Sequence, residues 1–214
     1  MNVVDHETVE FTQKKQILQN DLSGLAYISR TDLSSKQKDS ITQYKSNSTD
    51  YNVFLRNDDS IFQVNRTVYD IIANIDRAFE LELSKIPFEL ELFRGIPYSV
   101  AENIVSNYAY LESGFISTTF DLMEAYNYSK FFQNSQHHES SPDGFIPILL
   151  ILCEPGDKGI YLGNWEFEIL LNRGQIWTVL SDKKYSLIRI IPEDGNINQI
   201  VELKSVRFIA IKRK

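Results

Sequence analysis

The sequence predicts an α+β fold, because helix-like patterns fill its first half and strand-like patterns fill its second half. Apolar residues recur at helical spacing over 67–83, whereas five apolar runs rich in Ile, Leu and Val follow residue 144. Helices and strands therefore do not alternate as in a parallel βαβ fold. The 214-residue length and 43% hydrophobic content indicate one domain, mainly helical over 1–85 and β-rich over 86–214.

The helical half begins with thin apolar stripes in residues 10–50, which predict short surface helices. A firmer amphipathic helix is predicted over 67–83, where one face carries Val68, Ile71, Ile72, Ile75 and Phe79. Pro87 lies in the loop that follows, and the helix is expected to end before it, because proline is not tolerated inside a helix. Two further helices are expected at 100–110 and 122–132.

Strands are expected where short apolar runs are bounded by turn residues. The predicted strands are 90–93, 114–120, 145–152, 166–171, 176–180, 185–191 and 201–211. The run at 146–152 is almost wholly apolar, which is typical of a strand covered on both faces.

The charge balance is acidic, with 22 Lys+Arg against 29 Asp+Glu and a net charge of −7. Such a chain gains little attraction to phosphate backbones or anionic lipids, so nucleic-acid and polybasic membrane binding are both disfavoured. His137 and His138 are adjacent and lack further ligands at metal spacing, so no metal site is expected. Cys153 lies in an apolar run, where we expect a buried and inert thiol.

The chain shows no targeting segment. The first 16 residues carry acidic side chains and lack the apolar core of a secretory signal, and no apolar stretch approaches the ~20 residues that span a bilayer. If the protein leaves its cell, the route is not visible in this sequence.

Two acidic side chains alternate with apolar ones in Trp165-Glu166-Phe167-Glu168-Ile169. If this segment is a strand, Glu166 and Glu168 project to the same face and repel each other, while Phe167 points into the core. Taken alone, the pair is typical of a solvated strand face. A compensating donor or cationic ligand would instead favour a functional site.

Hydroxyl and guanidinium groups lie on two other predicted strands. Ser117 and Thr119 share one strand face, where their hydroxyls can donate to a carboxylate on a neighbouring strand. Arg94 follows the strand over 90–93 and precedes Gly95, whose backbone a ligand can approach closely. A planar guanidinium suits phosphate groups. Taken singly, β propensity and a surface arginine also explain these features.

Taken together and in this order, the three features resemble the R-S-E class of mono-ADP-ribosyltransferases, in particular the Rho-modifying exoenzymes and the binary actin-modifying toxins. Segments 39–44, 51–56 and 75–79 are also similar to that family, so the resemblance covers roughly residues 36–180. It implies a core of two roughly perpendicular β-sheets with N-terminal helices, and NAD as the substrate.

The resemblance implies a role for each site residue. Glu168 would bind the ribose 2′-hydroxyl and stabilise positive charge at C1′, and Ser117 would orient Glu168. Glu166 would orient an acceptor arginine and take its proton. The residues implied to contact or support the bound NAD are Arg94 at the phosphates, Gly95 at the nicotinamide amide, Thr119, Asn52 and Arg56.

Acceptor choice in this family follows the first acid of the pair, with glutamine for asparagine acceptors and glutamate for arginine acceptors. Glu166 therefore implies an arginine. Tyr161 and Trp165, in the glycine-rich segment 156–165, are candidate contacts with the target protein. Segment 133–144 has no Lys or Arg, although these enzymes usually place a second arginine there, so either Arg56 carries more of the phosphate binding or NAD binds more weakly.

The sequence thus predicts an arginine-directed mono-ADP-ribosyltransferase, a secreted effector or toxin that acts in the target-cell cytosol on a host protein, with actin one candidate. An NAD glycohydrolase and a non-catalytic binding module on the same fold stay open. The intact set of Arg94, Ser117 and Glu168 is contrary to the binding module.

Overall fold

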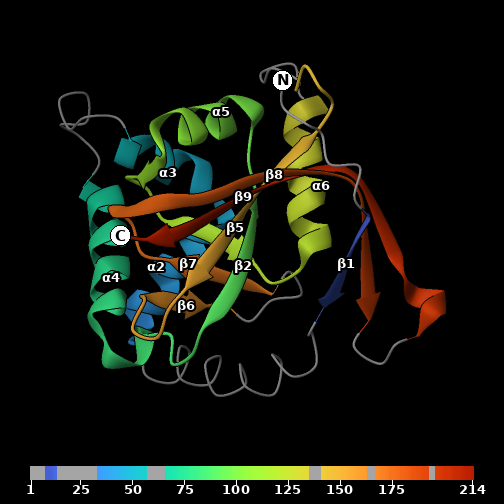
Figure 1. The fold of residues 1–214 in the computed structure, drawn as a ribbon. Coiled ribbons are helices and arrows are strands. Elements are labelled where there is room, and N and C mark those ends of the chain that lie inside the picture. Colours follow the sequence, from blue (N-terminus) through green and yellow to red (C-terminus); the bar gives the residue numbers. More distant parts are fainter. Residues whose placement is uncertain (1–7, 14–32, 57–65, 135–140, 163–166, 193–195) are drawn as a thin grey trace.

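The computed structural model describes residues 8–13, 33–56, 66–134, 141–162, 167–192 and 196–214 (Figure 1). The helices are α2 (Ser35–Ser46), α3 (Ser48–Arg56), α4 (Arg66–Glu80), α5 (Tyr98–Asn107) and α6 (Leu122–Asn134), with 3-10 turns at η2 (Glu82–Ser84) and η3 (Ile197–Gln199). The strands are β1 (Thr8–Gln13), β2 (Leu90–Gly95), β3 (Ala109–Glu112), β4 (Ile116–Thr119), β5 (Ile146–Cys153), β6 (Gly159–Tyr161), β7 (Glu168–Leu171), β8 (Gln175–Pro192) and β9 (Val201–Arg213). The predicted α+β class is confirmed.

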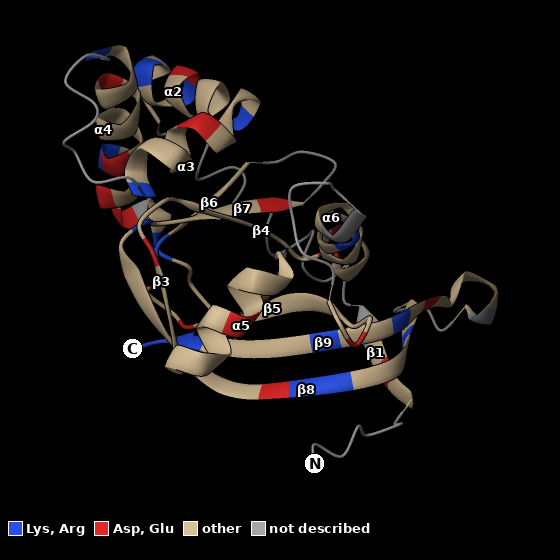
Figure 2. Ribbon diagram, turned by 90° about the horizontal axis from the view of Figure 1, so that it is seen from above, with Lys and Arg blue, Asp and Glu red and all other residues tan. Residues whose placement is uncertain are grey.

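Helices α2, α3 and α4 gather at one side of the molecule (Figure 2). Ser34 begins α2 with a capping box, because its hydroxyl accepts from the Gln37 amide and its own amide donates to the Gln37 side chain. The amphipathic helix expected over 67–83 is confirmed as α4, whose buried stripe is Ile71, Ile72, Ile75, Ala78 and Phe79. This stripe packs with Phe115 and Leu170 of the sheet.

The strands form one hydrogen-bonded path in the order β1-β8-β9-β5-β2-β4-β7-β6, and β3 pairs with β8. The path has two parts, β1-β8-β9-β5-β2 and β4-β7-β6. They meet where β2 pairs with β4, and among the described residues only Phe93 and Thr119 are paired between these two strands. Figure 2 shows β4, β6 and β7 in one layer, and β5, β8 and β9 in another. Leu149 and Ile151 of β5 lie in one hydrophobic cluster and Ile148 in another, which confirms that this strand is covered on both faces.

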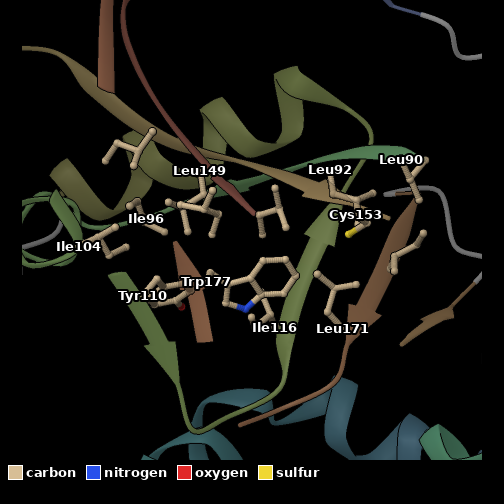
Figure 3. Close-up of a cluster of buried hydrophobic side chains, with 14 of the residues drawn as sticks. Leu90, Leu92, Ile96, Ile104, Tyr110, Ile116, Leu149, Cys153, Leu171 and Trp177 are labelled. Atoms are coloured by element: carbon tan, nitrogen blue, oxygen red, sulfur yellow. The ribbon is translucent and has the colours of Figure 1, made fainter. Parts of the chain in front are cut away.

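The main core lies between the two parts of the sheet (Figure 3). Trp177 of β8 is 2% exposed and packs there with side chains from β2, β4, β5 and β7. Along β2, Leu90 and Leu92 face this core, whereas Phe93 faces a second cluster beneath α6. The same alternation places Arg94 on the face between the layers and Gly95 on the face towards α6.

Several expected boundaries differ from those in the structure, including the end of α4 at Glu80 and the bounds of β4. Helix α5 ends at Asn107 rather than near residue 110, because Tyr108 is left-handed with φ 51° and the chain enters β3. The runs 176–180 and 185–191 join in one strand, β8, because both pair with the single long strand β9. Strand β7 begins at Glu168 rather than at residue 166. Strands β1, β3 and β6 are further elements that the sequence patterns did not indicate.

Within the described ranges, no helix is long and apolar enough to cross a membrane. Among the same residues, His, Cys, Asp and Glu side chains form no group of three that could hold a metal ion. His137 and His138 lie outside the described residues.

Cys153 is expected to react slowly with thiol reagents while the protein is folded. Its side chain is 2% exposed, and burial raises the pKa of the thiol, so both access and the thiolate fraction are reduced. Titration with a coloured disulfide reagent should detect about one thiol per chain in denaturant and far slower reaction in buffer. Equal rates in the two conditions would contradict the buried position.

Candidate active site

Strands β4 and β7 bring Ser117 and Glu168 into direct contact. Their antiparallel register pairs Thr119 with Glu168 and Ser117 with Leu170, so Ser117 is the diagonal neighbour of Glu168. The Ser117 hydroxyl donates to Glu168 Oε1 at 2.5 Å, and Glu168 is buried. The predicted pairing of the serine strand with the second acid is therefore present in the structure.

Glu168 has a further partner that the sequence did not indicate. Lys45, near the end of α2, places its Nζ 3.1 Å from Glu168 Oε2. One carboxylate oxygen therefore accepts from Ser117 and the other faces an ammonium group. No local pattern distinguishes Lys45 from the other lysines of this polar helix. Its partner Glu168 lies more than 120 residues away in the sequence, so sequence spacing gives no sign of the contact.

Tyr44 fixes the end of α2 on the serine strand. Its hydroxyl contacts the Phe115 carbonyl at 3.4 Å, and its ring meets the Phe115 ring edge-on. Burial raises the pKa of Tyr44 to about 12, while Arg94 opposes the rise and Glu168 adds to it. Tyr44 directly precedes Lys45, whose Nζ contacts Glu168, so this end of α2 lies at the site.

Arg94 stands at the junction of the two parts of the sheet. Its guanidinium donates to the Ser117 carbonyl at 3.0 Å, which links the end of β2 to β4 beyond the single paired position. The side chain is partly exposed. The structure thus brings the predicted residues Arg94, Ser117 and Glu168 together through direct contacts.

Gly95 has a packing role as well as an accessible backbone. A Cβ atom at this position would lie 2.2 Å from the Ala125 carbonyl oxygen of α6, so no larger residue fits. The Ile96 amide donates to the Pro147 carbonyl at 3.4 Å. Because donors alternate along an antiparallel ladder, the Gly95 amide and carbonyl point away from β5, towards the diverging β4.

Asn52 and Arg56 of α3 lie beside the site but are held by protein partners. Asn52 donates to the Tyr44 hydroxyl at 2.9 Å and accepts from the Phe115 amide at 3.1 Å. Arg56 donates twice to Glu112, at 2.8 and 2.7 Å. Burial pushes the pKa of Glu112 up, but the hydrogen bonds and charge of Arg56 more than offset it and hold this pKa below its usual value.

Thr119 and Asp121 organise the turn from β4 into α6. The Thr119 hydroxyl accepts from the Asp121 amide at 2.9 Å. The Asp121 carboxylate in turn accepts from the Met123 amide at 2.9 Å, as a helix N-cap does. Thr119 therefore stabilises the end of β4, the strand that carries Ser117.

Three predicted residues remain, and one of them, Tyr161, is the last residue of β6. Glu166 and Trp165 lie outside the described residues. Phe167 has φ 51°, so the strand alternation expected to align Glu166 with Glu168 does not extend through Phe167. Tyr161 is partly buried, with its ring centroid 6.1 Å from that of Phe120, so its ring contributes to the core.

A comparison with protein-family models matches residues 13–206 to the model described as ADP-ribosyltransferase exoenzyme. The matched range includes every residue of the site described above. A comparison with curated proteins gives no match.

Solved structures of the same fold include two toxins and an exoenzyme. Plx2a, an ADP-ribosyltransferase toxin from Paenibacillus larvae, is 15% identical with a TM-score of 0.66, over 97% of this chain and 100% of that one. The C3 exoenzyme of Clostridium limosum is 19% identical with a TM-score of 0.59, over 97% and 98%. The ADP-ribosylating toxin BECa of C. perfringens, solved with NADH, is 16% identical with a TM-score of 0.62, over 96% of this chain and 50% of that one. At these identities the similarity establishes the fold.

Proposed function

Because the chain belongs to the ADP-ribosyltransferase exoenzyme family, we propose that it transfers ADP-ribose from NAD to an arginine of a target protein. The observation that carries this proposal is the contact chain from Arg94 through Ser117 to Glu168. A guanidinium and a carboxylate are thus held a short distance apart, as a dinucleotide with an anionic pyrophosphate and a cationic nicotinamide requires.

The donor set fits NAD. Arg94 is partly exposed and would bind the pyrophosphate, and the Gly95 backbone groups directed towards β4 would bind the nicotinamide amide. Glu168 would accept from the ribose 2′-hydroxyl. We assign positioning roles to Asn52, Arg56 and Thr119. Their hydrogen bonds fix the backbone on either side of β4, the strand that carries Ser117, and the neighbouring residue Glu112.

In the transfer step, the bond between the ribose C1′ and the nicotinamide nitrogen breaks and its electron pair leaves with nicotinamide. An acceptor nitrogen forms the new bond to C1′. Positive charge develops on the ribose as the bond breaks, and Glu168, already held by Ser117, stabilises it. A protonated guanidinium is a poor nucleophile, so a base must take its proton.

Glu166 is proposed as that base, which gives the acceptor specificity. Tyr161 and Trp165 are proposed to face the target protein, and for Tyr161 only the part of the ring outside the core is available. Two of the three similar proteins are named as ADP-ribosylating toxins, which supports a toxin or effector role. We propose that this role is exerted in the cytosol of a target cell. A host protein such as actin is then the candidate partner.

Replacing Glu166 with alanine is expected to lower transfer to protein by at least about 10²-fold while NAD hydrolysis persists. The acceptor loses its base, but Glu168 and Ser117 still stabilise the breaking bond. Label incorporated into protein and free nicotinamide, measured in one reaction, separate the two activities. Equal loss of both activities would refute the assigned role of Glu166.

The distinction between a transferase and an NAD glycohydrolase can be tested with NAD labelled in its adenosine part. Incubation with host lysate is expected to label a protein band in proportion to the nicotinamide released. NAD consumption with no labelled macromolecule would identify a glycohydrolase. Absence of any NAD-induced thermal shift would instead identify a non-catalytic binding module.

A further inference from the structure

We propose that Lys45 is an exchangeable cation of this site, which pairs with Glu168 in the free protein and moves to the NAD pyrophosphate when NAD binds. The proposal rests on the proposed function and adds to it a residue that controls when Glu168 becomes available. It starts from the 3.1 Å contact between Lys45 Nζ and Glu168 Oε2.

The backbone of Lys45 is held in place, whereas its side chain has room to move. The preceding residue, Tyr44, is 1% exposed and ties α2 to Phe115. The Lys45 side chain is 36% exposed, against 11% for Glu168. An ammonium on a flexible, partly exposed four-carbon stem that is anchored at its base can change partners without movement of the helix.

The ion pair is incompatible with the reaction step. Glu168 acts by stabilising positive charge on the ribose, and an ammonium in contact with the same carboxylate offsets that charge. It also repels the cationic nicotinamide. Lys45 must therefore leave Glu168 before the glycosidic bond breaks, and a new anionic partner within reach favours its departure.

The NAD pyrophosphate is the anionic partner that we expect for Lys45, because the other cations near the site do not neutralise it fully. Arg94 is proposed to bind it from the other side of Ser117, and its two negative charges exceed what one guanidinium neutralises. Arg56 is committed to Glu112 through two hydrogen bonds, and segment 133–144 contains no Lys or Arg. Lys45 contacts Glu168, which in turn contacts Ser117, so it lies at the same site and supplies the additional positive charge.

Exchange predicts that loss of Lys45 changes the binding of anionic and cationic ligands in opposite directions. In Lys45→Gln the dissociation constant of ADP-ribose should rise about tenfold, because a charge-assisted contact is lost. That of nicotinamide riboside, a cation without phosphate, should fall about threefold, because Glu168 is no longer paired. Lys45→Arg should restore ADP-ribose binding. Calorimetric titration of the full chain measures all of these values.

Lys38→Gln is the matched control, because Lys38 is exposed on the same helix and the variant has the same net charge. It should leave both dissociation constants unchanged. Changes of the same sign for both ligands in Lys45→Gln, or no change, would overturn the proposed exchange while leaving the transferase proposal intact. If the wild-type chain binds neither NAD nor ADP-ribose, the proposed function itself fails.

Discussion

Replacing Glu168 with glutamine is expected to remove both transfer to protein and NAD hydrolysis, each by about 10³-fold. The amide keeps the size of the side chain and can still accept from Ser117, but it carries no charge to stabilise the ribose. NAD binding should change far less, because Arg94 and the Gly95 backbone remain. Nicotinamide release and protein labelling, measured with a binding titration, test this directly.

The control for Glu168→Gln is Glu91→Gln, the same substitution at an exposed position of β2. That variant should retain wild-type activity. If Glu168→Gln hydrolysed NAD at a rate close to wild type, while remaining folded, the catalytic assignment of the Ser117 and Glu168 pair would be wrong.

Replacing Gly95 with alanine is expected to destabilise the fold by about 3 kcal/mol, because the new methyl group meets backbone rather than a movable side chain. It would lie 2.2 Å from the Ala125 oxygen and 2.5 Å from the Ser129 amide nitrogen. Ser129 is itself fixed, since its hydroxyl donates to the Pro147 carbonyl at 2.7 Å and lies 3.0 Å from the Ile96 carbonyl oxygen. For a chain of this length the melting temperature should fall by roughly 6–12 °C, as calorimetry can measure.

Gly159→Ala is the matched comparison, since its added methyl group would first meet the Ile86 Cδ1 atom at 3.1 Å, the end of a flexible side chain. It should cost clearly less stability than Gly95→Ala. An unchanged melting temperature in Gly95→Ala would mean that α6 does not pack on β2 as described.

Local sequence patterns were sufficient to predict an element when its own residues show which face is buried. The stripe of α4 and the apolar run of β5 each identify a buried face without knowledge of any partner, and both predictions are confirmed. The contact of Ser117 with Glu168 could also be anticipated, because a hydroxyl strand and an acidic strand have an obvious reason to pair.

Other features depend on partners far apart in the sequence. Lys45 meets Glu168 only because Tyr44 holds α2 over β4, and Arg56 meets Glu112 because Asn52 joins α3 to Phe115, three residues after Glu112. The left-handed backbone at Phe167 is a further case, since an alternating acid and apolar pattern predicts a continuous strand. Periodicity does not encode these contacts.

The identity of the modified residue tests the central claim most directly. Full-length protein should be incubated with NAD and host lysate, and the modified peptides analysed by mass spectrometry with fragmentation that retains the adduct. The arginine transferase proposed here predicts ADP-ribose on arginine side chains, absent when Glu168→Gln replaces the wild type. Adducts confined to another residue type, or NAD consumed without any adduct, would contradict it.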